Sequence, residues 1–197
     1  ATLVNYPGRL DGLTRALLKL NEEGRGAQAA YDENSDENPE LSCIGRPTPS
    51  MIIYTDLYPL EIEFRGEEII LIRSQFFDEE RTVHMDGRGH PGGSARFHEG
   101  HSIGWWEGDT LVVDVTNFSK QTNFHGSREN LHLTERFTRL DADTLRYQVT
   151  VEDPTTFTQP FTMIQELTKN SDQENKVYEG GCHEGNYGMI GMLISTR

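Results

Sequence analysis

Apolar and polar residues alternate with a period of two from Leu60 to Lys169, the pattern of strands that bury one face. The alternating runs predict about nine strands, at 60–64, 67–75, 80–86, 101–106, 110–118, 130–140, 144–153, 161–169 and 176–181. No helical pattern separates these runs, so we expect an antiparallel meander. Closure would remove its exposed edges, which predicts a mostly β protein with a closed or half-closed, lipocalin-like barrel. A flattened, two-layer open barrel is the alternative.

The first 42 residues follow a different pattern. Leucines at helical spacing predict a short amphipathic helix over 9–20, ended by Gly24 and Gly26. The acidic run YDENSDENPE then forms a solvated linker, because it lacks the glycine and the terminal glutamate of an EF-hand loop. We therefore expect an N-terminal arm at 1–42 and a β-barrel domain at 43–197.

Two turns, EGD and DAD, predict the register of two hairpins. As three-residue turns they place His101 opposite Val115 and Glu135 opposite Val149, with apolar residues facing apolar residues. The predicted inward face carries Ile103, Trp105, Leu111, Val113, Val115, Leu131, Leu133, Phe137, Leu145, Tyr147, Val149 and Val151. Four polar residues share its parity: His101, Asn117, Glu135 and Asp153. Buried polar groups need partners, so these four should meet one another, water or a ligand.

Histidines gather in the middle of the chain, six of them between positions 84 and 132. Connections of a meander alternate between its ends, so 87–100 and 119–129 should meet at one mouth of the barrel. Imidazole is a general acid or base near neutral pH, and a carboxylate can orient it. The predicted catalytic residues are His101, Glu135, His90 and His125, and the predicted ligand-binding residues are Asn117, Trp105, Trp106, Tyr147 and His98. Asp114 and His132 have the opposite parity and should lie outside. Turn histidines held by backbone hydrogen bonds are the alternative.

Other site chemistries are not indicated. His98 and His101 are three residues apart, one residue short of the HExxH spacing, and they precede a strand rather than lie on a helix. There is no GxSxG elbow, and the glycine-rich segment 87–93 follows no strand-to-helix pattern. We expect neither a metal nor another cofactor.

The net charge of the chain narrows the classes of molecule that it is expected to bind. The net charge of −14 argues against nucleic acid, which requires a basic surface. No apolar run approaches the roughly 20 residues of a membrane span. The expected partner is a small molecule, and a homodimer stays open.

The two cysteines, Cys43 and Cys182, flank the predicted strands, so closing the barrel should bring them together as a disulfide. Two reduced core cysteines are the alternative. The chain begins at Ala1 rather than Met, so we expect that a signal peptide or another upstream segment has been removed; of the two we favour a signal peptide, and with it export to the periplasm or the extracellular space.

Several motifs resemble a widespread family of exported bacterial proteins of unknown function: MDGRGHP, GHSIGWWEGDTLVVDVTNF, ENLHLTERF and CHEGNYGM. The resemblance runs from about Cys43 to the C-terminus. Positions that match the family motifs are Asp86, Arg88, His90, Trp106, Asp114, Asn117, Phe118, Glu129, Asn130, His132, Glu135, Arg136, Cys182, His183, Glu184 and Asn186. The resemblance implies an exported single-domain protein and carries no activity with it.

These patterns favour a pocket enzyme that uses histidine and carboxylate acid–base chemistry, of the lyase, isomerase or hydrolase type. Its substrate would be a small apolar or carbohydrate-like molecule. A non-catalytic ligand-binding barrel and an accessory module of an envelope assembly are the alternatives.

Overall fold

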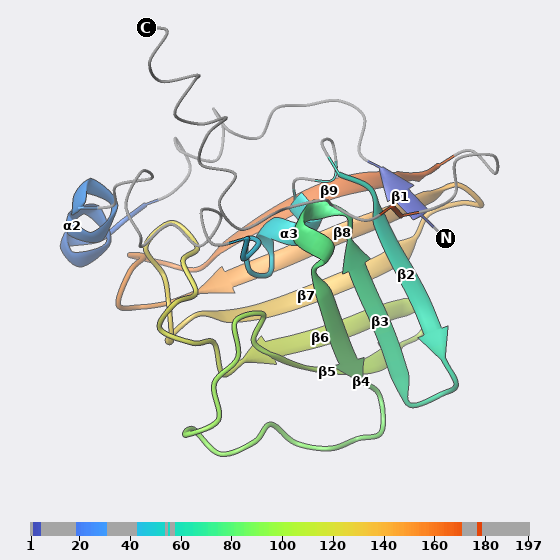
Figure 1. The fold of residues 1–197 in the computed structure, drawn as a ribbon, viewed down its shortest axis with the longest axis horizontal. Helices are drawn as coiled ribbons and strands as arrows, with labels where there is room; N and C mark the ends of the chain where they lie inside the picture. The colour runs from blue at the N-terminus through green and yellow to red at the C-terminus, as the bar shows by residue number, and fades with distance from the viewer. Residues whose placement is uncertain are drawn as a thin grey trace, which may run out of the picture.

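The strands form one curved β-sheet (Figure 1). The computed structural model describes residues 2–4, 19–30, 43–53, 55, 58–170 and 177–178. Eight strands follow one another in a single mixed sheet that curls into a half-barrel: β2 (Leu60–Arg65), β3 (Ile69–Ser74), β4 (Glu80–His84), β5 (His101–Glu107), β6 (Thr110–Thr116), β7 (His132–Arg139), β8 (Thr144–Glu152) and β9 (Phe161–Lys169). The short strand β1 (Thr2–Val4) pairs with both β2 and β9. The prediction of a mostly β protein is confirmed.

Eight of the predicted strands match β2 to β9 closely. The ninth, at 176–181, lies outside the described residues except for Val177 and Tyr178, which are not in a strand. The prediction of a purely antiparallel meander is wrong at one place. Strand β5 pairs with β4 in parallel, with Val83 opposite Ser102. The connection 85–100 is long enough to return the chain to the end from which β4 started, as a parallel pair requires.

Helices are few. The predicted helix at 9–20 lies outside the described residues except for Lys19 and Leu20, and Leu20 forms a β-bridge with Phe157. A helix begins later instead, α2 (Glu22–Ala30). Its first turn is capped by Asn21, whose side-chain oxygen accepts a hydrogen bond from the Gly24 amide at 2.8 Å. Gly24 and Gly26 therefore lie inside this helix and do not end one. A four-residue helix, α3 (Ser50–Ile53), and a 3₁₀ turn, Phe76–Asp78, precede β2 and β4.

The register of the β5–β6 hairpin differs from the prediction by one residue. Glu107 pairs with Thr110, so the turn has two residues, and Gly108 adopts a φ of +59° that suits such a tight turn. His101 consequently lies opposite Thr116, and the inward residues of β5 are Ser102 and Gly104, both buried. The predicted inward positions of His101, Ile103 and Trp105 are wrong.

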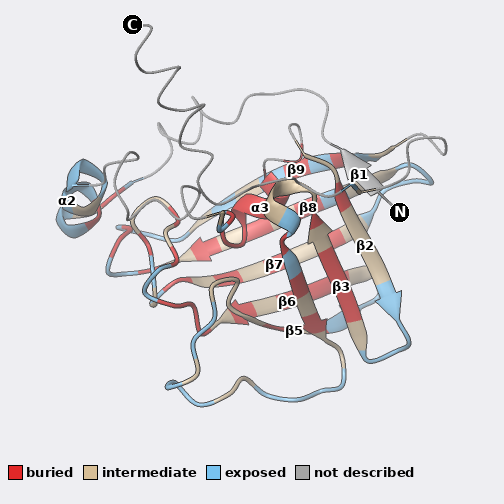
Figure 2. Ribbon diagram, in the orientation of Figure 1, coloured by how far each residue is buried: buried red, intermediate tan, exposed pale blue. Residues whose placement is uncertain are grey.

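The register of the β7–β8 hairpin is as predicted, with Glu135 opposite Val149 and Phe137 opposite Tyr147. The inward side chains of β6, β7 and β8 are accordingly buried, Glu135 included. Figure 2 shows buried and half-buried residues alternating along β7 and most of β8. One apolar face directed inward explains this alternation.

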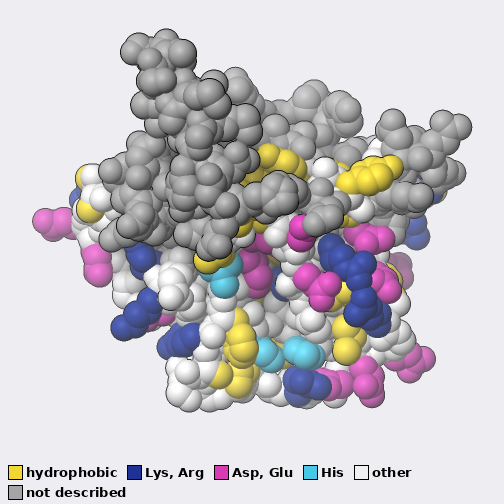
Figure 3. Space-filling model, viewed as in Figure 1, with side chains coloured by type: hydrophobic (Ala, Val, Ile, Leu, Met, Phe, Trp, Pro, Cys, Tyr) yellow, Lys and Arg dark blue, Asp and Glu magenta, His cyan; other side chains and the backbone are white. Residues whose placement is uncertain are grey.

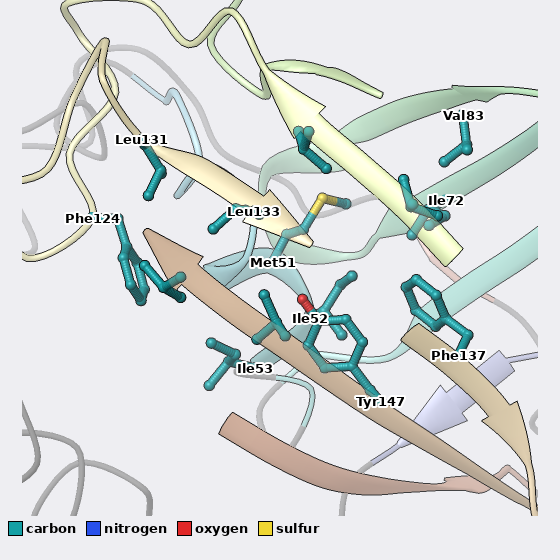
Figure 4. Close-up of a cluster of buried hydrophobic side chains, with 14 of the residues drawn as sticks. Met51, Ile52, Ile53, Ile72, Val83, Phe124, Leu131, Leu133, Phe137 and Tyr147 are labelled. Atoms are coloured by element: carbon teal, nitrogen blue, oxygen red, sulfur yellow. The ribbon is translucent and has the colours of Figure 1, made fainter. Parts of the chain in front are cut away.

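Side chains of α3 fill the interior that the sequence suggested as a ligand cavity. Met51, Ile52 and Ile53 are 3%, 0% and 7% exposed and belong to the main apolar core. Figure 4 shows them pointing among inward side chains of the strands, such as Phe137 and Tyr147. The half-barrel is thus a packed core around α3.

A buried ion pair crosses this core. Arg81 on β4 donates two hydrogen bonds to the Glu135 carboxylate on β7, at 3.2 and 2.5 Å, and both side chains are at most 1% exposed. The Tyr147 hydroxyl donates to the same carboxylate at 2.6 Å, and Arg81 also donates to the Thr48 hydroxyl at 3.1 Å. Burial opposes the charge of Arg81, but Glu135 reverses this effect and raises the pKa of Arg81. We call these four residues the buried network.

The outer surface of β2 to β4 carries a different kind of ion pair. Arg73 lies within 3.2 Å of three carboxylates, those of Glu61, Glu63 and Glu80, and its own side chain is 31% exposed. Figure 3 shows basic and acidic side chains intermixed over these strands. Such exposed pairs contribute little to stability.

Because Arg81 and Glu135 form a buried ion pair, replacing Arg81 by Met should destabilise the protein by about 3–5 kcal/mol, since Glu135 would remain as a buried charge without its partner. Arg146→Met is the matched control, since Arg146 forms an exposed pair with Glu166 and its loss should cost less than about 1 kcal/mol. The double variant Arg81→Met/Glu135→Leu should be more stable than Arg81→Met alone. Urea unfolding at pH 7 measures all three. Equal losses for Arg81→Met and Arg146→Met would contradict the structural importance of the buried pair.

Candidate outer-face acid–base site

Ionisable side chains form a continuous row across the outer face of the sheet. The row, called the outer row below, consists of His84, His90, His101, Asp114, His132 and Glu152. Five of these residues come from consecutive strands, β4 to β8, and their strand pairings place them on one face. The sixth, His90, comes from the connection 85–100. Histidine side chains reach the surface near the end of β4 in Figure 3.

Hydrogen bonds join the members of the outer row. The Nδ1 atoms of His101 and His90 are 2.9 Å apart, and His90 Nε2 lies 2.8 Å from Asp114 Oδ2. The other oxygen of Asp114 lies 2.6 Å from His132 Nε2. His132 Nδ1 in turn lies 3.2 Å from Glu152 Oε2. The ring of His84 stacks on that of His101, with centroids 5.1 Å apart.

The two ends of the outer row differ in electrostatics. A hydrogen bond to Asp114 raises the pKa of His132 against the effect of burial, and Glu152 adds to the rise. Hydrogen bonds from His132 and His90 lower the pKa of Asp114. At the opposite end, burial lowers the pKa of His101, and the neighbouring His90 lowers it further. Burial likewise lowers the pKa of His84.

These differences indicate a defined arrangement of protons. An ionised Asp114 only accepts hydrogen bonds, so His90 donates to it from Nε2, and the neutral form of His90 then has its lone pair on Nδ1. His101 then donates from Nδ1 to His90. A neutral His101 is left with its lone pair on Nε2, where it can accept a proton. The carboxylate thereby sets the tautomers of two successive imidazoles.

The backbone around Asn117 positions His90. Asn117 has a φ of +61°, and its side-chain amide donates to the carbonyl oxygen of Ala95 at 2.9 Å and approaches those of Pro91 and Gly92 at 3.3 and 3.4 Å. These contacts hold the connection 85–100 against the end of β6. Asn117, predicted to bind a ligand, has its amide donors occupied by backbone carbonyls.

The two connections expected to meet do so. The Ser119 amide donates to Phe97 O at 2.8 Å, and the Thr122 hydroxyl donates to His98 O at 2.9 Å. His125 lies in the second connection, with its ring 4.7 Å from that of Phe124.

The predicted site residues thus separate into groups. His90 and His101 come together on the outer face, whereas Glu135 and Tyr147 lie on the inner face in the buried network. Trp105 and Trp106 are 41% and 52% exposed, and Trp106 stacks on Phe64 with ring centroids 6.4 Å apart. The expected convergence of His101 and Glu135 on one mouth is not observed, because the register shift in β5 turns His101 outward.

His98 belongs to a second group, which we call the carboxylate–histidine cluster. Potential ligand atoms of Glu79, His98 and Glu99 all lie within 4.8 Å of one another. His98 Nε2 is 2.8 Å from Gly45 O and 3.7 Å from Glu99 Oε1. Burial raises the pKa of Glu99, although its other oxygen accepts hydrogen bonds from the amide and hydroxyl of Thr48 at 2.8 and 3.0 Å.

Sequence reasoning placed Asp114 and His132 correctly on the outer face but did not connect them with the other histidines. The signal was available as parity, because Asp114, His132 and Glu152 alternate with the buried residues of their strands. Glu79 and Glu99 left no comparable pattern, since Glu79 lies at the start of β4 and Glu99 in a connection.

Two surface cavities lie apart from the outer row. One, of 680 Å³, is lined by Trp106, Leu140 and the turns beside them. The other, of 410 Å³, lies between α2 and the segments around Arg128 and Thr155. Among the described residues, no helix has the length and apolar character needed to cross a membrane. The predicted partner of Cys43, Cys182, lies outside the described residues.

In comparisons with known proteins, no family model, curated protein or solved structure matches the chain. The function must therefore be inferred from the geometry of the sites.

His132→Gln should cost more stability at pH 6 than at pH 9. The raised pKa of His132 means that its charged form stabilises the fold, fully below the unfolded pKa of about 6.5 and progressively less as the pH rises through the folded value. His84→Gln is the control of opposite sign. The lowered pKa of His84 makes its contribution present above the unfolded pKa and lost as the pH falls through the folded value. Thermal denaturation of the three proteins at pH 5, 6 and 9 measures these effects, and parallel curves for both variants would contradict the assigned protonation states.

Proposed function

We propose that this chain is an exported enzyme that uses the outer row for acid–base chemistry of the lyase, isomerase or hydrolase type. The observation that carries this proposal is the unbroken hydrogen-bond chain from His101 through His90 to Asp114. A base oriented by a second group, which a carboxylate orients in turn, is the arrangement that general-base catalysis requires. The predicted pair of His101 with Glu135 is replaced by His101 with His90 and Asp114.

In the proposed reaction, His101 Nε2 takes a proton from a substrate or from water. The electron pair stays on the atom that loses the proton, and His101 becomes an imidazolium. Its Nδ1–H remains hydrogen-bonded to His90, whose Nε2–H is held by Asp114, so the negative charge of Asp114 stabilises the new positive charge. The proton later returns from His101 to the product or to the leaving group.

The surroundings of His101 favour a small and partly apolar substrate. The ring of Phe97 lies 6.0 Å from that of His101 and is 44% exposed, which offers an apolar contact beside the base. The ring of His84 also stacks on that of His101. An aromatic ring suits both an apolar molecule and the apolar face of a sugar.

The proposal is tested by incubating the full chain in D₂O with a panel of small ketones, esters and uronic-acid derivatives. Proton NMR follows deuterium exchange, elimination and hydrolysis of each compound. The wild-type protein should accelerate one of these reactions for at least one compound class, and His101→Gln should lower that rate by roughly 100-fold or more. Asp114→Asn should lower it as well, because it disturbs the tautomer of His90. Glu67→Gln, an exposed charge change in the β2–β3 turn, is the control.

Two results would overturn this assignment. Equal rates for wild type and His101→Gln would remove His101 as the base. Loss of activity in His125→Gln but not in His101→Gln would move the site to the connection that follows β6.

The second candidate function is non-catalytic ligand binding at the cavity beside Trp106. This cavity combines exposed aromatic and aliphatic surface with Asp109, Arg139 and Asp141, a lining suited to a sugar or another small polar molecule. Saturation-transfer NMR on the same panel distinguishes the two functions. Binding without any reaction, abolished by Trp106→Ala and unaffected by His101→Gln, would favour this candidate.

We further propose that β1 closes the half-barrel into a lipocalin-like barrel and that Cys43 pairs with Cys182 after export. The pairing of β1 with both edge strands supports the first part. A closed loop of about 140 residues would contribute roughly 4–5 kcal/mol in the chain-entropy model.

Mass spectrometry of the protein isolated without reductant should show a gain of two hydrogens upon reduction. Cys43→Ser should abolish this gain and lower the thermal stability. Two free thiols in the non-reduced protein would rule out both the disulfide and the argument for export that rests on it.

A further inference from the structure

The carboxylate–histidine cluster is a compact set of ligands from two separate segments. Glu79 immediately precedes β4, whereas His98 and Glu99 end the connection 85–100. Their potential ligand atoms lie within 4.8 Å of one another. Ligand atoms of a tetrahedral zinc ion lie roughly 2.0–2.2 Å from the ion and hence about 3.3–3.6 Å from one another, so side-chain rotations that draw the cluster closer would bring all three onto one ion.

The backbone of Gly45 supplies a fourth donor. Gly45 O lies 2.8 Å from His98 Nε2, a separation that two ligands of one ion can adopt. A Cβ at this position would lie 2.2 Å from Glu79 Oε1, so only glycine allows the Glu79 carboxylate to approach the backbone this closely. Gly45 is the one glycine of the segment 43–53, and it lies where the Glu79 carboxylate approaches the backbone.

The burial of the two carboxylates supplies an independent reason for a cation. Glu79 is 9% exposed and the side chain of Glu99 is 16% exposed. Glu99 Oε1 is buried and has no hydrogen-bond partner among the described residues, although it faces His98. Keeping two ionised carboxylates this close and this buried costs free energy, and a cation bound between them would offset that cost.

We propose that Glu79, His98, Glu99 and the carbonyl oxygen of Gly45 bind one divalent transition-metal ion, Zn²⁺ or Mn²⁺. The imidazole ligand favours such an ion over Ca²⁺ and Mg²⁺, which prefer oxygen ligands alone. The ion takes the place of the Nε2 proton of His98 between the ring and its oxygen neighbours. It joins the segment around Gly45 to the connection 85–100, and it is separate from the outer row and independent of the proposed enzymatic activity.

Isothermal titration calorimetry on the tag-free full chain, first stripped with EDTA, tests this site with ZnCl₂, MnCl₂ and CaCl₂. We expect one equivalent of Zn²⁺ or Mn²⁺ to bind, and CaCl₂ to bind at least tenfold more weakly. His98→Gln and Glu79→Gln should each weaken metal binding at least tenfold. Glu67→Gln makes the same glutamate-to-glutamine change at an exposed position outside the cluster, so this variant should bind the metal as the wild type does.

The outer row is the other place in the described structure where the ion could bind, and metal binding by the His101→Gln variant tests this alternative. Unchanged metal binding in His101→Gln together with loss in His98→Gln supports the proposed site. Loss in His101→Gln with binding retained in His98→Gln overturns it, and so does the absence of a one-equivalent site for Zn²⁺ and Mn²⁺ in the wild-type protein. Circular dichroism identifies a variant that does not fold, and Glu79→Gln then decides the question, since it preserves the size of the side chain.

Discussion

The ion pair between Arg81 and Glu135 is the interaction on which the arrangement of the sheet depends. Strands β4 and β7 are not neighbours, so this contact spans the interior and fixes the distance between two parts of the curved sheet. Tyr147 adds β8 to the same carboxylate, and Thr48 adds the segment that leads into α3. A purely apolar core could pack in several ways, whereas directed hydrogen bonds between charged groups favour one of them.

The same sheet separates two kinds of chemistry by the alternation of its side chains. Val113 and Glu135 face the core, and the next residue along β6, Asp114, faces the histidines outside. The interior groups of the buried network are buried and hydrogen-bonded to one another. The outer groups are partly exposed and joined by hydrogen bonds through which protons can move, so the outer face is the side suited to reactions.

The strands were predictable because their alternation is regular, and the β7–β8 register was predictable because apolar residues on both strands allow only one pairing. The β5–β6 register was not, because the inward residues of β5 are Ser102 and Gly104, while the larger Ile103 and Trp105 face outward. This reversal hid the contact of His101 with His90 and Asp114. The packing of α3 in the interior and the pairing of Arg81 with Glu135 depend on contacts between residues far apart in sequence. A local sequence pattern does not contain such contacts.

The outer row crosses the strands and takes one residue from each of β4 to β8, so its hydrogen bonds depend on the assembled sheet. Its members span positions 84 to 152, and each hydrogen bond between them joins separate strands or a strand and a loop. No fragment that lacks part of 84–152 contains the whole row, and no single helix or hairpin can form it alone. The shifted pKa values of His84, His101 and His132 therefore belong to the assembled sheet as a whole. They should appear and disappear together with global unfolding, which makes histidine ionisation a direct reporter of the native state.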